Sequence, residues 1–149
     1  MMKRTIALAA ALLAAAGCVA AGKPGVRVED AWARATPAVA PVAGGFLTAI
    51  NDGDAPDVLL GVESDIAQRV EIHEMRMQDG IMRMRRLDAG VPVPAHGKAV
   101  LAPGGYHLMF IQPKRALVEG ERFEATLVFR HAGRVKTQFA VRALGAGAH

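Results

Sequence analysis

The segment His73–Met84 reads HEMRMQDGIMRM and contains the turn that decides how the middle of the chain folds. Side chains of different character alternate on both sides of Asp79-Gly80, a dipeptide typical of a two-residue type I′ turn between antiparallel strands. With Asp79 and Gly80 as the loop, Met75 lies directly opposite Met84. The segment therefore predicts a β-hairpin whose register is fixed by its turn.

The register of this hairpin decides which side chains share a face of the sheet. Directly paired residues project to the same side. One face is therefore predicted to hold His73, Met75, Met77, Met82 and Met84. The opposite face is predicted to hold Arg76, Arg83 and Arg85. His73 and Met84 are diagonal neighbours whose backbones lie about 7–8 Å apart, a gap that long side chains can close.

The methionines and two of the histidines form a candidate soft-metal site. Every methionine after the initiator pair lies between Met75 and Met109, and His107 shares a predicted strand face with Met109. Thioether sulfur favours Cu(I), and imidazole accepts many metals. If this face meets the hairpin, two imidazoles and two thioethers converge. The alternative is a methionine-lined core, but two histidines and the lack of Leu, Ile and Val on that hairpin face argue against packing alone.

The rest of the chain is predicted to consist of short strands separated by turns that contain Gly or Pro. With 149 residues, the chain is long enough for one domain with a core. The candidate strands are residues 26–28, 43–50, 58–62, 69–77, 82–85, 91–94, 98–101, 106–111, 123–130 and 135–141. Their spacing of about ten residues predicts an all-β antiparallel sandwich or barrel.

The beginning of the chain has the pattern of an export signal. Two basic residues precede an apolar run over residues 5–16, which is shorter than the about 20 residues of a membrane-spanning helix. Two processing routes remain open: ordinary cleavage near residue 21, or a lipoprotein signal that ends before Cys18 and leaves it lipidated. We predict a signal peptide over 1–21, a β-sandwich domain over 22–142 and a flexible tail over 143–149.

The composition excludes several classes of protein. Cys18 is the only cysteine, which excludes an internal disulfide. If Cys18 is cleaved off or lipidated, no thiolate remains, which excludes a cysteine zinc site and a blue-copper centre. Lys3 and Arg4 supply two units of the formal charge of +4, so little supports nucleic-acid binding by the rest of the chain. We find no Ser/His/Asp set and no phosphate-binding loop, so an enzyme is not expected. His96 and His131 lie in predicted turns and are expected to be ordinary surface histidines.

The spacing of these histidines and methionines resembles the signature of the PCuAC family of periplasmic copper chaperones. That signature is a His, a spacer, a Met, a second spacer and then His-x-Met. Here ten residues separate His73 from Met84, and 22 residues separate Met84 from His107, which forms His-x-Met with Met109. The resemblance runs from about residue 26 to 142. It includes the segments 31–34, 73–75, 79–80, 103–109 and 117–120.

This resemblance implies a cupredoxin-like Greek-key β-sandwich with one Cu(I) site formed by His73, Met84, His107 and Met109. It implies a periplasmic chaperone, expected to be a monomer, that delivers copper to the CuA site of cytochrome c oxidase or works with a Sco-like copper protein. Contact with a membrane is expected only through a lipid anchor at Cys18. The alternatives are a copper-sequestering or tolerance protein with the same site, and a structural β-sandwich.

One departure from the family pattern leaves part of the ligand set open. Some versions of the signature have a Met directly after the first His, where this chain has Glu74, followed by Met75. Met75 is therefore an alternative or additional thioether to Met84. Met77 and Met82, which lie nearest the turn, are predicted to form an apolar collar or docking surface.

Overall fold

Every regular element in the described part of the protein is a β-strand. A computed structural model describes residues 25–147, so the predicted signal peptide with Cys18 and the last two residues lie outside the described range. The ten strands are β1 (Val26–Arg34), β2 (Val42–Asn51), β3 (Asp57–Glu63), β4 (Ala67–Gln78), β5 (Ile81–Arg86), β6 (Val91–Val93), β7 (Gly97–Leu101), β8 (Tyr106–Pro113), β9 (Arg122–Phe129) and β10 (Gly133–Arg142). Each predicted strand is present, and the all-β prediction is confirmed. Strand β1 extends well beyond the predicted segment 26–28.

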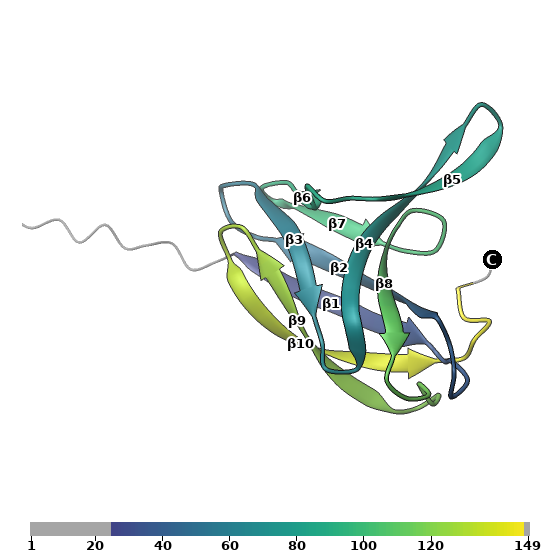
Figure 1. Ribbon diagram of the computed structural model, residues 1–149. Helices are drawn as coiled ribbons and strands as arrows, with labels where there is room; N and C mark the ends of the chain where they lie inside the picture. Colours follow the sequence, from purple (N-terminus) through teal and green to yellow (C-terminus); the bar gives the residue numbers. More distant parts are fainter. Residues whose placement is uncertain (1–24, 148–149) are drawn as a thin grey trace, which may run out of the picture.

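The ten strands form one continuous sheet that folds over on itself (Figure 1). Their order is β5-β4-β8-β7-β2-β1-β10-β9-β3-β6. Strand β3 also contacts β4, and β6 contacts β7, so the two ends of the sheet approach each other. Most neighbours are antiparallel, as predicted, but β1 with β10 and β7 with β8 are parallel. The first of these parallel pairings joins the first and last strands of the domain, which no hairpin connects.

The core lies between the two layers of the folded sheet and contains three phenylalanines from β8, β9 and β10. Phe110 packs edge-on against Phe123 and Phe139, with ring centroids 5.4 and 5.7 Å apart. Phe123 stacks on Phe139 at 5.4 Å. All three are buried, and aromatic rings favour such edge-to-face and offset contacts. The cluster fixes β8 against the opposite layer.

Alternation along β4 and β8 sends one set of side chains into the core and the other set to the outer face. Ile72 on β4 is paired with Leu108 on β8, and both are buried in the core. Their neighbours His73 and His107 therefore project from the outer face of the sheet. The methionine face of the hairpin lies on this outer side, which overturns the alternative of a methionine-lined core.

The end of the domain packs back onto its first strand. Residues 143–147 form a turn in which the Ala146 amide donates to the Ala143 carbonyl at 2.9 Å. The Ala146 carbonyl accepts from Nε of Arg34 at 3.2 Å. Trp32 is buried, as expected of a core residue, and contacts Phe46 with ring centroids 4.5 Å apart. The predicted flexibility of the tail stays a prediction.

Candidate metal centre

The hairpin of β4 and β5 has the register that the sequence predicts. The predicted register pairs six residues of each strand, from His73 with Arg86 to Gln78 with Ile81, and all six pairs are present, with Met75 directly opposite Met84. Asp79 and Gly80 both have positive φ, at 52° and 75°. A type I′ turn requires this conformation at its two central residues. The predicted hairpin is therefore confirmed.

Strand β8 lies beside β4 on the side away from β5, and it brings the second histidine to the hairpin. His73 is directly opposite His107, and Glu71 is opposite Met109. The ring centroids of the two histidines are 5.8 Å apart. The sequence leaves open whether the face of His107 meets the hairpin, and the structure places both on one face of the same sheet. The four predicted ligands thus come from three adjacent strands.

The ring of His107 is oriented so that one nitrogen faces a methionine sulfur. Its Nδ1 is 3.0 Å from the carbonyl oxygen of Gly105, and its Nε2 is 3.3 Å from Sδ of Met84. A carbonyl oxygen only accepts, so Nδ1 donates and the lone pair of Nε2 faces the sulfur. Burial lowers the pKa of His107, with the Gly105 hydrogen bond opposing the effect. The ring is therefore held in the neutral form that binds metals.

His73 is held by a carboxylate that the sequence motif does not include. Its Nε2 is 2.8 Å from Oε2 of Glu71. Glu71 also accepts from Nε of Arg69 at 2.8 Å and from Nη1 of Arg86 at 3.4 Å. The hydrogen bonds from His73 and Arg69 lower the pKa of Glu71, which stays ionised. The other ring nitrogen of His73, Nδ1, is buried and has no hydrogen-bond partner among residues 25–147.

A shallow cavity on the outer face holds the remaining candidate thioethers beside His107. Its volume is about 350 Å³, and its lining includes Met75, His107 and Met109. Met84 is outside this lining and approaches His107 from β5. Met75 is also tied to the loop before β8, because its amide donates to the Gly105 carbonyl at 3.0 Å. The geometry therefore brings the four predicted ligands together and keeps Met75 as a candidate.

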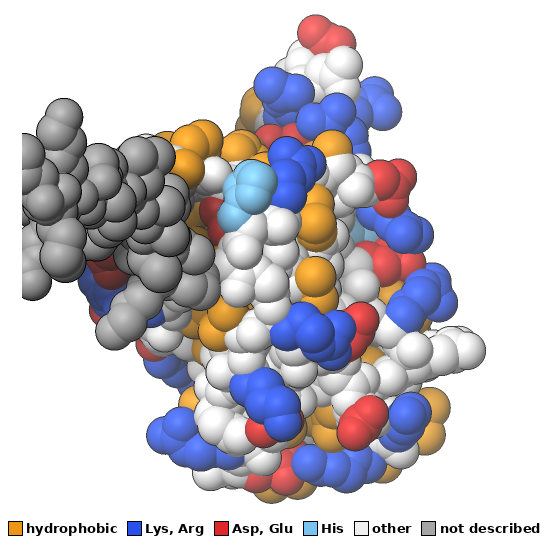
Figure 2. All heavy atoms as spheres, turned by 90° about the vertical axis from the view of Figure 1, so that its left-hand side faces the viewer, with side chains coloured by type: hydrophobic (Ala, Val, Ile, Leu, Met, Phe, Trp, Pro, Cys, Tyr) orange, Lys and Arg blue, Asp and Glu red, His pale blue; other side chains and the backbone are white. Residues whose placement is uncertain are grey.

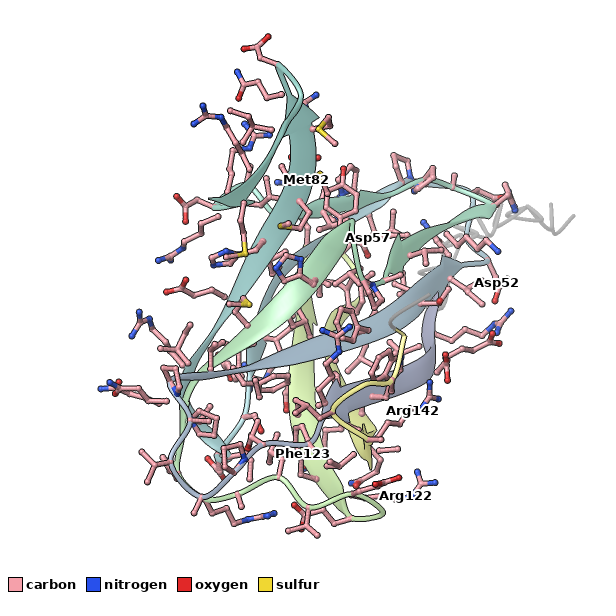
Figure 3. All side chains as sticks on the ribbon, turned by 90° about the vertical axis from the view of Figure 1, so that its right-hand side faces the viewer. Asp52, Asp57, Met82, Arg122, Phe123 and Arg142 are labelled. Atoms are coloured by element: carbon pink, nitrogen blue, oxygen red, sulfur yellow. The ribbon has the colours of Figure 1, made fainter. Side chains whose placement is uncertain are left out.

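The hairpin projects from the body of the protein beyond the candidate ligands (Figure 1). Met77 and Met82 are 62% and 46% exposed, and Figure 3 shows Met82 on this projection. Arg76, Arg83 and Arg85 line its other side. Figure 2 shows basic side chains gathered at this projection, whereas over the rest of the visible face basic and acidic side chains are interspersed.

The remaining histidines of the described range lie apart from this cluster. His96 and His131 are exposed, as predicted, and Nε2 of His96 is 2.7 Å from a carboxylate oxygen of Asp54. Within residues 25–147, no group of three or more His, Cys, Asp and Glu side chains is arranged to hold a metal ion. Over the same range, the structure contains no helix of the length and hydrophobicity needed to cross a membrane.

The fold and the site define an all-β, cupredoxin-like domain with a histidine and methionine cluster on its outer face. Residues 26–141 match the family described as "Putative lipoprotein LpqE-like". The chain belongs to this family.

The chain is similar to a curated relative in sequence and to solved structures in fold. The "Putative lipoprotein Lxx21020" of Leifsonia xyli subsp. xyli (strain CTCB07) is 31% identical over 141 residues, which cover 85% of this chain and 81% of that protein. The structure "Copper-bound PCuAC domain from PmoF2" is 29% identical, with a TM-score of 0.68 over 80% of this chain and 93% of that chain. The solution structure of CuI-DR1885 from Deinococcus radiodurans is 22% identical, with a TM-score of 0.64 over 90% and 87% of the two chains. The cupredoxin-like prediction is confirmed.

Proposed function

We propose that this protein is a copper chaperone that binds one Cu(I) ion through His73, Met84, His107 and Met109. The proposal is carried by the 3.3 Å approach of His107 Nε2 to the Met84 sulfur, beside a His73 ring whose Nδ1 is buried without a partner in the described range. Free imidazole nitrogen and thioether sulfur in one place form a donor set that suits Cu(I). The similarity to a copper-bound PCuAC domain supports this function.

The donor set is suited both to holding the metal and to releasing it. Thioethers and imidazoles are neutral, and soft sulfur favours Cu(I) over the cupric ion. Neither group binds as tenaciously as a thiolate. Met84 is 51% exposed, whereas His107 is 8% exposed. An acceptor can therefore displace the accessible thioether first, while the buried imidazole keeps its position.

The proposed recipient is the CuA site of cytochrome c oxidase, reached directly or through a Sco-like copper protein. The projecting hairpin, with Met77 and Met82 exposed beside the ligands, supplies a surface for docking. The predicted export signal and the similarity to a protein described as a lipoprotein support a periplasmic location, with Cys18 as the residue for a lipid anchor. The four proposed ligands come from one chain, so we propose that the protein works as a monomer. We propose that it moves a metal ion and is not an enzyme.

Cu(I) competition titration of the purified chain tests the site. The wild type should bind one equivalent, and His107→Ala and Met109→Ala should each weaken binding by about tenfold or more, since even residues that only support metal ligands contribute that much. His96→Ala and Met77→Ala are the matched controls, because they remove the same groups from exposed positions outside the site. The absence of stoichiometric binding, or unchanged binding in His107→Ala, would refute the site.

X-ray absorption of the Cu(I) form tests the composition of the ligand set. The proposed set predicts equal numbers of sulfur and nitrogen ligands. Comparison of Met75→Leu with Met84→Leu then decides between the two thioethers that flank His107. If Met75→Leu loses a sulfur ligand and Met84→Leu does not, the assignment of Met84 is wrong.

Gene deletion tests whether the proposed chaperone delivers copper to the oxidase. Loss of the chaperone should lower oxidase activity at limiting copper. A strain with normal oxidase activity at limiting copper and poor survival in excess copper would instead support the alternative, a sequestering or tolerance protein that uses the same site.

A further inference from the structure

Glu71 lies beside His73 on the outer face and is not part of the proposed ligand set. The side chains of Glu71 and His73 are only 10% and 14% exposed. Oε2 of Glu71 is 2.8 Å from Nε2 of His73, and Oε1 accepts from Arg69 at 2.8 Å and from Arg86 at 3.4 Å. Two arginines from neighbouring strands, β4 and β5, therefore hold the carboxylate against the histidine.

This carboxylate determines which nitrogen of His73 carries the ring hydrogen. An ionised carboxylate has only acceptor atoms, so the nitrogen that faces it must be the donor. In neutral His73, the hydrogen is consequently on Nε2 and the free lone pair is on Nδ1. Nδ1 is buried and has no hydrogen-bond partner among residues 25–147. Folded proteins pair nearly all buried polar atoms, and a bound metal ion would supply the missing partner.

The second histidine has the reverse arrangement. Nδ1 of His107 is 3.0 Å from the Gly105 carbonyl, and its Nε2 faces the sulfur of Met84. The two rings therefore offer different atoms, Nδ1 from His73 and Nε2 from His107. Metal-binding histidines commonly donate their other ring N–H to a carboxylate or a carbonyl, which fixes the tautomer. One partner of each kind is present here.

We propose that Glu71 is a positioning residue that holds His73 in its Nε2–H tautomer and presents Nδ1 to Cu(I). This inference rests on the proposed function, because it names the ligand atom of the proposed copper site. Glu71 acts through the ring of His73 and does not itself bind the metal, since both of its oxygens are engaged by nitrogen donors. Its contribution is the orientation and the tautomer of one imidazole.

Long-range ¹H–¹⁵N correlation spectra of the full apo chain test the tautomers directly. At a pH where the spectra show both rings to be neutral, His73 should carry its hydrogen on Nε2 and His107 on Nδ1. Glu71→Ala should turn His73 into a mixture of tautomers and leave His107 unchanged. Glu71→Gln keeps an acceptor oxygen and should restore the wild-type pattern. Glu74→Ala is the matched control, because Glu74 lies on the opposite face of β4 and pairs with Arg85.

Addition of Cu(I) to the same samples separates this inference from the proposed function. Copper should shift the Nδ1 resonance of His73, and Glu71→Ala should weaken Cu(I) binding by about tenfold while Glu74→Ala does not. Loss of the Nε2–H signal of His73 when copper binds, or a His73 tautomer that is unchanged in Glu71→Ala, would overturn the positioning role. A wild-type chain with the expected tautomers that binds no Cu(I) would overturn the proposed function and the ligand assignment, and would leave the control of the tautomer by Glu71 standing.

Discussion

Asp57 at the start of β3 contributes a stability that can be worked out from its contacts. The residue is 5% exposed and is labelled in Figure 3. Its carboxylate accepts at 2.7, 2.9 and 2.8 Å from the backbone amides of Val58, His131 and Ala132. Hydrogen bonds to a charged group contribute about 1.5–3 kcal/mol each. In Asp57→Ala, the amide donors in the turn can form hydrogen bonds to water instead. We therefore take a loss of about 1 kcal/mol for each of the three hydrogen bonds and expect Asp57→Ala to lower the free energy of unfolding by about 3 kcal/mol.

The same contacts predict how this stability depends on pH. Burial of Asp57 raises its pKa, but the three backbone donors outweigh burial and leave the pKa below the ordinary value of aspartate. A lowered folded-state pKa stabilises the protein above the unfolded-state pKa of about 3.9, and this stability is lost as the pH falls through the folded-state pKa. The difference between wild type and Asp57→Ala should therefore be largest near neutral pH and shrink in acid.

Urea denaturation of both proteins at neutral and acid pH measures these differences. Glu63→Ala is the control, because hydrogen bonding from Arg134 lowers the pKa of Glu63 as well. Both side chains of that ion pair are more than half exposed, and exposed pairs contribute little to stability. A loss below about 1 kcal/mol in Asp57→Ala at neutral pH, or a difference that does not shrink in acid, would refute the reasoning.

Three further substitutions test the site, the hairpin and the turns. Met84→Leu should weaken Cu(I) binding by about tenfold or more in competition titration while Met77→Leu does not, and equal affinities would contradict the assignment of Met84. Arg83→Glu should leave Cu(I) affinity unchanged and slow copper transfer to an acceptor with an acidic face, measured by stopped flow; an unchanged rate would argue against docking through the hairpin. Gly90→Ala should lower the unfolding temperature far more than Gly104→Ala, because a Cβ at Gly90 would lie 2.2 Å from a backbone carbonyl oxygen, whereas at Gly104 nothing lies within 4 Å. Both glycines have positive φ, so Gly104→Ala should lose only the about 1–2 kcal/mol of stability that the strained backbone costs. Similar losses of stability in the two variants would show that backbone strain, and not the steric clash at Gly90, sets the effect.

The hairpin was predictable from the sequence because local signals determine it. Asp79-Gly80 fixes the turn, and alternation on both sides fixes the register and the shared face. The strands were predictable for the same reason, since Gly- and Pro-containing turns separate short alternating segments. The pairing of strands that lie far apart in the sequence was not predictable. The parallel pairing of β1 with β10 joins segments about a hundred residues apart, and no local pattern indicates it.

The residues of the candidate site could be named from the sequence, but their arrangement could not be predicted from it. The position of His107 directly opposite His73 depends on the pairing of β8 with β4, which local sequence does not reveal. Glu71 had a signal, because it stands two residues before His73 and shares its strand face. The hairpin register also places Arg86 opposite His73 on this face, but the sequence does not show that Glu71 hydrogen-bonds the His73 ring. Met75 and Met84 share a face and flank the same histidine, so neither sequence nor register separates them.

The outer position of the histidine and methionine cluster has a consequence for how this protein can change. On β4 and β8, inward side chains such as Ile72, Leu108 and Phe110 pack the core, and the residues between them carry the histidines and methionines. Substitution of the outward set should change the candidate ligands while the packed interior stays intact. Each of these strands thus carries core residues on one side and candidate ligand residues on the other. The scaffold should accept a redesigned set of outward donor side chains without redesign of its interior.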